Sequence, residues 1–219
     1  MIPVYQPSIT SLENQYVNDC LDSSWISSKG KYVNLFEKSF AEKTGVDYAT
    51  TVCNGTVALH LALLALGIGP GDEVIVPTFT YIASVNAIVY CGATPIFVDC
   101  LEDTWQVDPE DVAKKITSKT KAIMIVHLYG QSCDMDSICK IVKENDIFLV
   151  EDCAEGFGTR YKGRHVGSFG DISTYSFFGN KTITAGEGGM VVSNNAELAS
   201  KVAMFRSHGI TRGPSLLQS

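Results

Sequence analysis

Short apolar runs alternate with stretches of helical periodicity along most of this chain. Runs bounded by polar or turn residues predict strands at 48–53, 73–77, 94–99, 121–126, 147–150, 171–176 and 190–193. Helical spacing of apolar residues predicts helices at 57–66, 82–91, 135–144 and 196–205, and Asp108 followed by Pro109 marks the start of another. Strands and helices in alternation are typical of a mostly parallel sheet with helices on both faces, so we expect the α/β class.

The first part of the chain departs from this alternation. Residues 8–44 predict two helices around a polar turn at 23–30. Trp25 and Ile26 lie in that turn, and from the sequence alone we expect them to be a buried anchor for the loop. We therefore divide the chain into an N-terminal helical segment (1–45), a large domain (46–209) and a tail without a pattern of its own (210–219).

One lysine, Lys181, lies between an apolar run and a glycine-rich turn at 186–189. Such a turn lets the backbone approach a ligand closely. A desolvated lysine loses its proton more readily and becomes a nucleophile towards a carbonyl carbon, as formation of a Schiff base requires. The alternative is a β-hairpin whose lysine points to solvent.

An apolar strand that ends in acidic residues precedes this lysine by roughly thirty positions. The acids are Glu151, Asp152 and Glu155. Side chains alternate along a strand, so Glu151 and Asp152 point to opposite faces, and alternation alone does not choose which of them faces a ligand. The acid-ended strand favours the functional interpretation of Lys181 over the solvent-exposed hairpin.

A helix that begins at Gly55 and Thr56, directly after a strand, is a candidate phosphate site. Its first N–H groups have no partner within the helix, and its dipole favours an anion there. In the alternative interpretation Asn54 is an ordinary N-cap. The glycine-rich turn at 66–72 lacks the last glycine of GxGxxG, and the sequence has no P-loop, which argues against the usual dinucleotide and nucleoside triphosphate sites.

Aromatic residues and a histidine follow two other strands. Phe79 and Tyr81 come after the strand at 73–77, at the edge where such sheets bind ligands, although both could instead fill space beneath the next helix. His127 follows the strand at 121–126, and a lone histidine there is more often structural than catalytic.

Composition narrows the class of protein. The chain has 219 residues and a net charge of -7 without a basic run, which argues against nucleic acid as a partner. Its seven cysteines include no CxxC pair, so we expect a reducing compartment and no metal site. The N-terminus has no secretory signal pattern, and no apolar run reaches about eighteen residues, so we expect a cytoplasmic protein without a membrane partner.

Three motifs, at 152–158, 176–181 and 186–189, together resemble the pyridoxal-phosphate-dependent nucleotide-sugar aminotransferases of the DegT/DnrJ type, which have the fold of aspartate aminotransferase. The similarity runs from about residue 7 to residue 208, and the motifs occur in the order typical of the family. The dehydratase branch of this family has histidine in place of the lysine, so Lys181 favours transamination.

The resemblance assigns a partner to each group of pyridoxal phosphate. It implies that Lys181 binds the aldehyde and then acts as the base, and that Asp152 keeps the ring nitrogen protonated. The other contacts that it implies are Gly55, Thr56 and Ser176 for the phosphate, Tyr81 for the ring face and Glu155 for the phenolate side. It places Phe79 in the core.

The resemblance also implies substrates and partners. These are a nucleotide-linked 4-keto-6-deoxysugar, glutamate as the amino donor, and a second subunit in a homodimer. It favours contact of Trp25 and Ile26 with that subunit or with the substrate. Members of the family are longer and carry a small C-terminal domain that we expect to be absent here, so the alternative is a truncated, inactive or regulatory remnant that binds the cofactor or dimerises.

Overall fold

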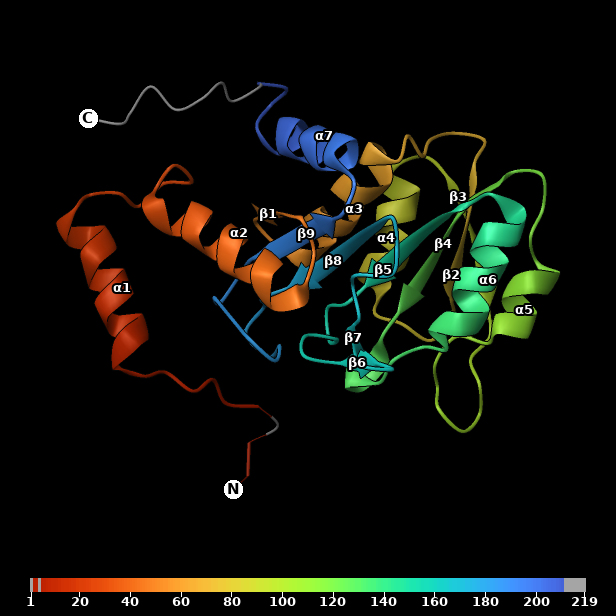
Figure 1. The fold of residues 1–219 in the computed structure, drawn as a ribbon, viewed down its shortest axis with the longest axis horizontal. Helices are drawn as coiled ribbons and strands as arrows, with labels where there is room; N and C mark the ends of the chain where they lie inside the picture. Colours follow the sequence, from red (N-terminus) through yellow and green to blue (C-terminus); the bar gives the residue numbers. More distant parts are fainter. Residues whose placement is uncertain (1, 4, 211–219) are drawn as a thin grey trace.

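The sheet has seven strands in the order β1-β9-β8-β5-β4-β2-β3 (Figure 1). The computed structural model describes residues 2–3 and 5–210. The strands are β1 (Tyr48–Val52), β2 (Glu73–Pro77), β3 (Thr94–Val98), β4 (Thr120–Val126), β5 (Phe148–Asp152), β8 (Ile172–Ser176) and β9 (Gly189–Ser193). Strands β3, β2, β4, β5 and β8 are parallel, whereas β9 is antiparallel to both of its neighbours. The predicted mostly parallel sheet is confirmed.

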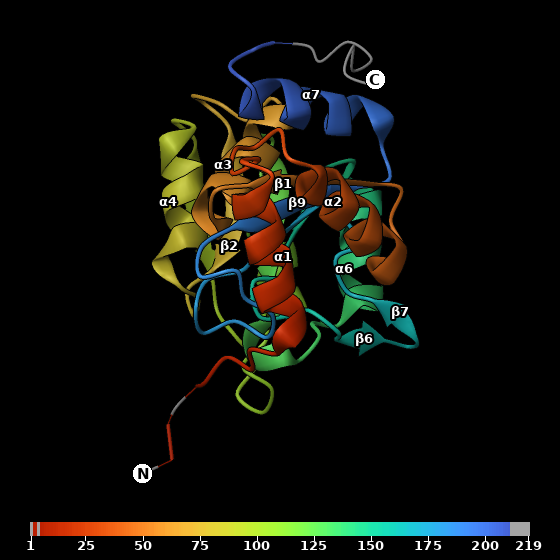
Figure 2. The same cartoon turned by 90° about the vertical axis from the view of Figure 1, so that its left-hand side faces the viewer.

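Helices cover both faces of the sheet (Figures 1 and 2). The helices of the chain are α1 (Ser11–Asp22), α2 (Lys31–Thr44), α3 (Gly55–Ala65), α4 (Ile82–Tyr90), α5 (Pro109–Lys114), α6 (Met135–Asn145) and α7 (Ala196–Arg206), with a 3-10 turn η1 (Leu128–Gly130), and all but α1 lie against the sheet or its loops. Helices α3, α4 and α7 share one core with the sheet, and α5 and α6 share the core on the opposite face. Helix α2 packs on β8 and β9 through a third cluster. Val150 and Leu149, neighbours on β5, belong to opposite cores, so this strand is buried on both sides.

Polar side chains begin the helices where the sequence predicts them. Asn54 caps α3 by accepting the N–H of Val57, and Asp108 caps α5 with proline at its start. Helix α3 is apolar on nearly every side and is correspondingly buried. Among the described residues, none of the helices is long and apolar enough to cross a membrane.

Helix α1 stands apart from the body of the molecule (Figure 1). It buries none of its residues, and Asp19 joins it to the start of α2 through Lys31 at 2.7 Å and the hydroxyl of Tyr32 at 2.9 Å. The predicted buried anchor in the following turn is wrong: Trp25 is 48% exposed and Ile26 is 76% exposed. The reason is that α1 does not fold back on the sheet, so this turn has no core beneath it.

The glycine-rich stretch after β5 contains a short hairpin that the sequence did not predict. Strands β6 (Arg160–Tyr161) and β7 (Arg164–His165) pair around a turn in which Lys162 and Gly163 have φ of 48° and 85°. Two-residue strands are too short to show alternation. At the other end, α7 is confirmed, and of the predicted tail only Ile210 lies within the described residues.

Close backbone packing at the start of β9 generates a prediction about stability. An ideal Cβ on the buried Gly189 would lie 2.6 Å from the carbonyl oxygen of Asn54. Gly189→Ala should therefore lower the free energy of unfolding by about 1–3 kcal/mol, as overpacking does. Urea denaturation measures the change. Gly69→Ala is the control, since its Cβ would meet nothing within 4 Å; equal stability of the two variants would contradict the prediction.

Candidate functional site

A cavity of about 410 Å³ lies where β5 and β8 end and where α3 and α4 begin. The structure brings all the predicted site residues to it: Gly55, Thr56, Tyr81, Asp152, Glu155, Ser176 and Lys181 line its wall. The parallel strands explain this arrangement, because their carboxyl ends meet at one edge of the sheet and the following helices begin there.

Lys181 lies in the connection between β8 and β9, and its side chain is 17% exposed. These strands do form an antiparallel pair, but the lysine does not point freely into solvent as in the simple hairpin alternative. Its Nζ is 3.5 Å from Oε1 of Glu155, and Oε2 of Glu155 accepts the N–H of Tyr129 at 2.7 Å. The carboxylate thus links the lysine loop to the turn after β4.

Asp152 ends β5 with its carboxylate towards the cavity, and the residue is 4% exposed. Its Oδ2 accepts the hydroxyl of Ser84 at 2.8 Å, and its Oδ1 accepts the N–H of Ala154 at 3.0 Å. Burial raises the pKa of Asp152, while these two hydrogen bonds and the charge of Lys181 oppose the rise. The ambiguity left by strand alternation is resolved, since Asp152 lines the cavity.

Glu151 is fully buried on the other face of β5, where five donors surround its carboxylate. The donors are the ring of His127 at 3.0 Å, the N–H groups of Gly167, Phe169 and Gly170 at 2.7, 2.7 and 2.6 Å, and the hydroxyl of Ser173 at 3.3 Å. Burial opposes ionisation, but the hydrogen bonds from His127 and from the backbone hold the pKa of Glu151 below its ordinary value. The buried His127 belongs to this network, in agreement with the predicted structural role.

The same network contains three atoms of metal-ligand type. His127, Glu151 and Cys153 bring theirs within 4.8 Å of one another. However, Nδ1 of His127 accepts the N–H of Cys133 at 3.2 Å, and both oxygens of Glu151 already accept hydrogen bonds. The cluster is therefore accounted for as a hydrogen-bond network, without an ion.

The cavity also has an end suited to an anion. The N–H groups of Gly55 and Thr56 belong to the first turn of α3, where a helix offers them no acceptor. Ser176 faces this turn closely: an ideal Cβ on Gly55 would lie 2.8 Å from Cβ and 3.1 Å from Oγ of Ser176. Asn54 is the N-cap as well, so its capping role and an anion site at the same turn are compatible.

Sequence reasoning missed three polar residues that line the cavity, Thr174, Asn180 and Glu187, and Thr174 is the buried one among them. Thr174 is 1% exposed and lines the cavity, and its Oγ1 has no hydrogen-bond partner among the described residues. It is the register partner of Asp152 across the β5–β8 pair. Buried hydroxyls are normally satisfied, so this one is a donor available to a ligand. Period-two alternation from Ser176 could have identified it.

These groups together fit pyridoxal phosphate. The cavity offers an amine for an aldehyde, a buried carboxylate for a ring nitrogen, first-turn N–H groups with a hydroxyl for a phosphate, and the unpartnered Thr174 hydroxyl. Tyr81, the N-cap residue of α4, adds an aromatic side chain that is 77% exposed. An aromatic with that much free surface can stack on a planar ring.

Phe79 does not belong to the core, contrary to the prediction. It is 40% exposed and lies against Trp105, with the ring centroids 5.7 Å apart. It comes after the end of β2, beyond the part of the strand that α3 and α4 cover, which is why it remains at the surface.

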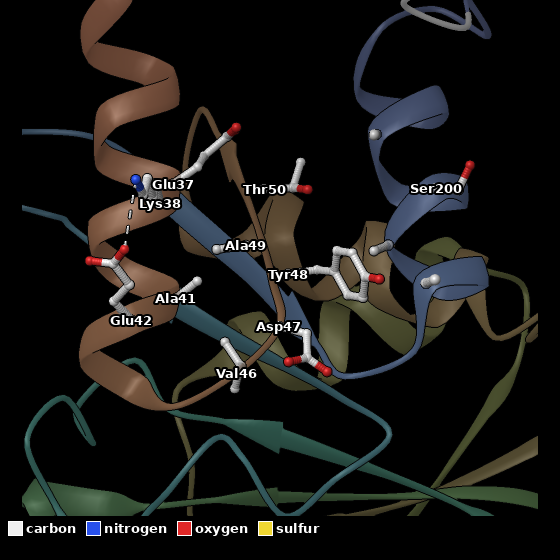
Figure 3. Close-up of a pocket in the computed structure, with 13 residues that line it drawn as sticks. Glu37, Lys38, Ala41, Glu42, Val46, Asp47, Tyr48, Ala49, Thr50 and Ser200 are labelled. Atoms are coloured by element: carbon white, nitrogen blue, oxygen red, sulfur yellow. Dashed lines mark ion pairs between the residues drawn. The ribbon is translucent and has the colours of Figure 1, made fainter.

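A second hollow, of about 690 Å³, lies between α2, β1 and α7 (Figure 3). On its α2 side Lys38 and Glu42 form an ion pair of 4.0 Å. None of the predicted site residues lines this hollow, and exposed ion pairs of this kind are typical of a solvated helix face.

Comparison with known proteins gives a consistent picture. Residues 7–216 match the model of the DegT/DnrJ/EryC1/StrS aminotransferase family. A GDP-perosamine synthase from Escherichia coli O157:H7 is 66% identical over 95% of this chain and 57% of its own length. An aminotransferase from Psychrobacter cryohalolentis superposes with a TM-score of 0.89 at 43% identity, over 94% of this chain and 52% of its own.

A further solved structure bears on the cofactor. A Streptococcus pneumoniae protein assigned as a sugar aminotransferase, in its PLP form, has a TM-score of 0.88 at 34% identity, over 93% of this chain and 57% of its own. Pyridoxal phosphate is thus the ligand of a solved structure that this chain resembles. The chain spans a little more than half the length of the relatives that it matches.

The Glu151 network generates a prediction about stability and pH. Glu151→Gln keeps the size of the side chain but leaves buried donors without a carboxylate, so it should cost about 3–5 kcal/mol of unfolding free energy at pH 7. The folded-state pKa is depressed, so the carboxylate stabilises the fold above the unfolded pKa of about 4.3 and loses that effect as the pH falls through the folded value.

Urea denaturation at pH 7 and under acid conditions measures both effects. The difference between the two proteins should shrink in acid. The exposed Glu102→Gln is the control and should behave like wild type. A difference that persists unchanged below the folded pKa would show that the charge of Glu151 is not what stabilises the fold.

Proposed function

Since the chain belongs to the DegT/DnrJ/EryC1/StrS aminotransferase family, we propose that it binds pyridoxal phosphate in the 410 Å³ cavity and transfers an amino group to a nucleotide-linked ketosugar. The observation that carries the proposal is the presence of Lys181, Asp152 and the Ser176 anion end in one cavity. We take residues 46–209 as the cofactor-binding unit.

Each residue has a distinct task in this proposal. Pyridoxal phosphate, when bound, supplies the electron sink for the carbon that loses its proton. Lys181 would hold the aldehyde carbon of the cofactor, and its Nζ would be the base that moves the proton to and from the donor carbon. Asp152 keeps a proton on the ring nitrogen, because an ionised carboxylate favours a neighbouring cation.

The remaining residues hold and orient the ligand. Gly55 and Thr56 offer backbone N–H groups, and Ser176 offers a hydroxyl, to the phosphate. Tyr81 stacks on the ring, which contributes about 0.5–1.5 kcal/mol beyond burial. Glu155 would lie on the phenolate side of the cofactor ring. The 3.5 Å separation between its Oε1 and Nζ of Lys181 supports a second role, in which Glu155 holds the lysine amine at this side of the cavity.

The substrate proposal follows the relatives. The Escherichia coli protein at 66% identity is named GDP-perosamine synthase, which supports GDP-4-keto-6-deoxymannose as the acceptor and its 4-amino sugar as the product. Glutamate is the proposed donor and leaves as the 2-keto acid, so the amino group and the keto oxygen exchange places between the two substrates. The chain's seven cysteines are all free, which supports action in the cytoplasm.

We further propose that the working form is a homodimer in which α1 packs on the second subunit. Leu12, Tyr16, Val17 and Leu21 lie on one half of α1 and are 43–60% exposed. Trp25 and Ile26, in the turn that follows α1, are exposed apolar side chains as well. A helix that has no buried residue in its own subunit gains stability by covering such a surface with a partner.

The cofactor proposal is tested by absorbance. Wild-type protein mixed with pyridoxal phosphate should develop the visible band of a lysine-bound cofactor, and glutamate should shift this band towards that of pyridoxamine phosphate. Lys181→Ala should show neither change and should lose turnover by orders of magnitude, because it has no amine at this position. Borohydride should trap the cofactor on Lys181.

The matched control is Lys140→Ala on the exposed side of α6, which should behave like wild type. A wild-type band that glutamate does not shift would support the alternative, a cofactor-binding remnant without transaminase activity. A Lys181→Ala protein that transaminates at the wild-type rate would exclude the proposed mechanism. A panel of nucleotide 4-ketosugars then identifies the acceptor.

The dimer proposal is tested by light scattering. Val17→Glu combined with Leu21→Glu places charges on the apolar half of α1 and should convert dimer to monomer at micromolar concentration, since an unpaired buried charge is costly. Gln15→Glu, on the polar half of the same helix, is the control. A double variant with the wild-type mass in solution would show that α1 does not form the interface.

A further inference from the structure

Ser84 is a buried hydroxyl that none of the roles above uses. It lies in the first turn of α4 and is fully buried. Its Oγ donates to Oδ2 of Asp152 at 2.8 Å, a contact between two residues 68 positions apart in the chain. A carboxylate has no proton to donate when ionised, so the serine is the donor in this pair.

A second hydroxyl stands behind the first. Oγ1 of Thr80 lies 3.1 Å from Oγ of Ser84. A serine hydroxyl has one proton, and that of Ser84 is donated to Asp152. In the contact between the two hydroxyls, Thr80 is therefore the donor and Ser84 the acceptor. The hydroxyls of Thr80 and Ser84 therefore form a chain directed at the carboxylate, and each bond in such a chain strengthens the next.

The remaining contacts of Asp152 show what this chain of hydroxyls controls. The N–H of Ala154 donates to Oδ1, so Ser84 and Ala154 together hold both oxygens of the carboxylate. Burial favours the neutral acid at this position, and the hydrogen bond from Ser84 is among the interactions that favour the charged form. Without the hydrogen bond from Ser84, burial would raise the pKa of Asp152 further.

Ser84 also connects the carboxylate to the aromatic wall of the cavity. Its N–H donates to the carbonyl of Tyr81 at 3.2 Å, and Tyr81 is the N-cap residue of α4. One serine thus ties the end of β5 to the start of α4. Asp152 ends β5 and Tyr81 follows β2, and the two hydrogen bonds of Ser84 hold these residues in position relative to each other.

We propose that Ser84, supported by Thr80, is a positioning residue for Asp152: it keeps this carboxylate ionised and in the orientation that serves the ring nitrogen of pyridoxal phosphate. The inference rests on the proposed function for the identity of the ligand, whereas the link between Ser84 and Asp152 is a property of the protein itself. Ser84 need not touch the cofactor.

The first test uses the protein without cofactor. Carbon-13 NMR of the side-chain carboxyl of Asp152 gives its titration in wild type, Ser84→Ala, Ser84→Thr and Thr80→Val. Loss of a hydrogen bond to the charged form should raise the pKa of Asp152 in Ser84→Ala, less so in Thr80→Val, and Ser84→Thr should restore the wild-type value. Lys181 and His127 are the charged or titratable groups that also act on Asp152, and they are unchanged in all four proteins.

The second test uses the protein loaded with cofactor labelled with nitrogen-15 at the ring nitrogen. In Ser84→Ala the signal should move towards that of the unprotonated ring, and the rate of the half-reaction with glutamate should fall between about tenfold and a hundredfold, as loss of a charge-assisted hydrogen bond predicts. The KM for glutamate should change little, since Ser84 lies behind Asp152.

Ser137→Ala is the matched control. Ser137 makes the same kind of hydrogen bond to a carboxylate, 2.6 Å to Asp134, on the exposed surface of α6. It should leave the Asp152 titration and the ring signal unchanged.

Two outcomes separate this proposal from the proposed function. In the first outcome, the wild-type protein transaminates, but Ser84→Ala has the same Asp152 titration and the same ring-nitrogen signal as wild type. This result overturns the proposed role of Ser84 and leaves the proposed function intact. A wild-type protein without a glutamate half-reaction overturns the proposed function, and the cofactor-free titration still decides whether Ser84 controls Asp152. A merely structural serine would lower stability without moving either signal.

Discussion

The hydrogen bonds that converge on the buried Glu151 carboxylate fix the end of β5. They come from the turn after β4, from the loop that leads into β8, and from β8 itself. A buried charge is tolerated only when its partners are complete, so these segments must assemble together. Asp152 follows Glu151 in β5, so the same contacts fix its backbone, while its side chain lies on the cavity side of the strand. The carboxylate on one face of the strand thus determines where the carboxylate on the other face lies.

Parallel strand order explains why one cavity collects groups from so many parts of the chain. Strands β2, β4, β5 and β8 end at the same edge, and the segments after them carry Tyr81, Glu155 and Lys181 to it. The antiparallel β9 then returns beside β8, and Gly189 permits close contact with Asn54 at the start of α3. The lysine connection is therefore braced against the helix whose N-terminus forms the anion end of the cavity.

Much of this could be predicted from the sequence because the signals are local. Alternating strands and helices, the caps at Asn54 and Asp108, and the motif around Lys181 are all contiguous patterns. What the sequence could not supply was contact between distant residues. The exposure of Trp25 and Phe79 depends on whether other elements cover them. The contact of Ser84 with Asp152 depends on where α4 lies against the end of β5. Alternation places Thr174 on the same face as Ser176, but that its hydroxyl has no partner among the described residues is a property of the folded chain.

The cavity wall is shared among α3, α4, β5 and the β8–β9 connection, and none of these segments contains more than a part of it. A ligand that touches all of them gains its full binding free energy only from the folded chain, because an unfolded chain presents the pieces far apart. By mass action, occupancy at a hundred times the dissociation constant would add about 2.7 kcal/mol to the stability of the whole domain. A ligand of this cavity, such as the proposed cofactor, would therefore act on the folded fraction of the chain as well as on the proposed reaction.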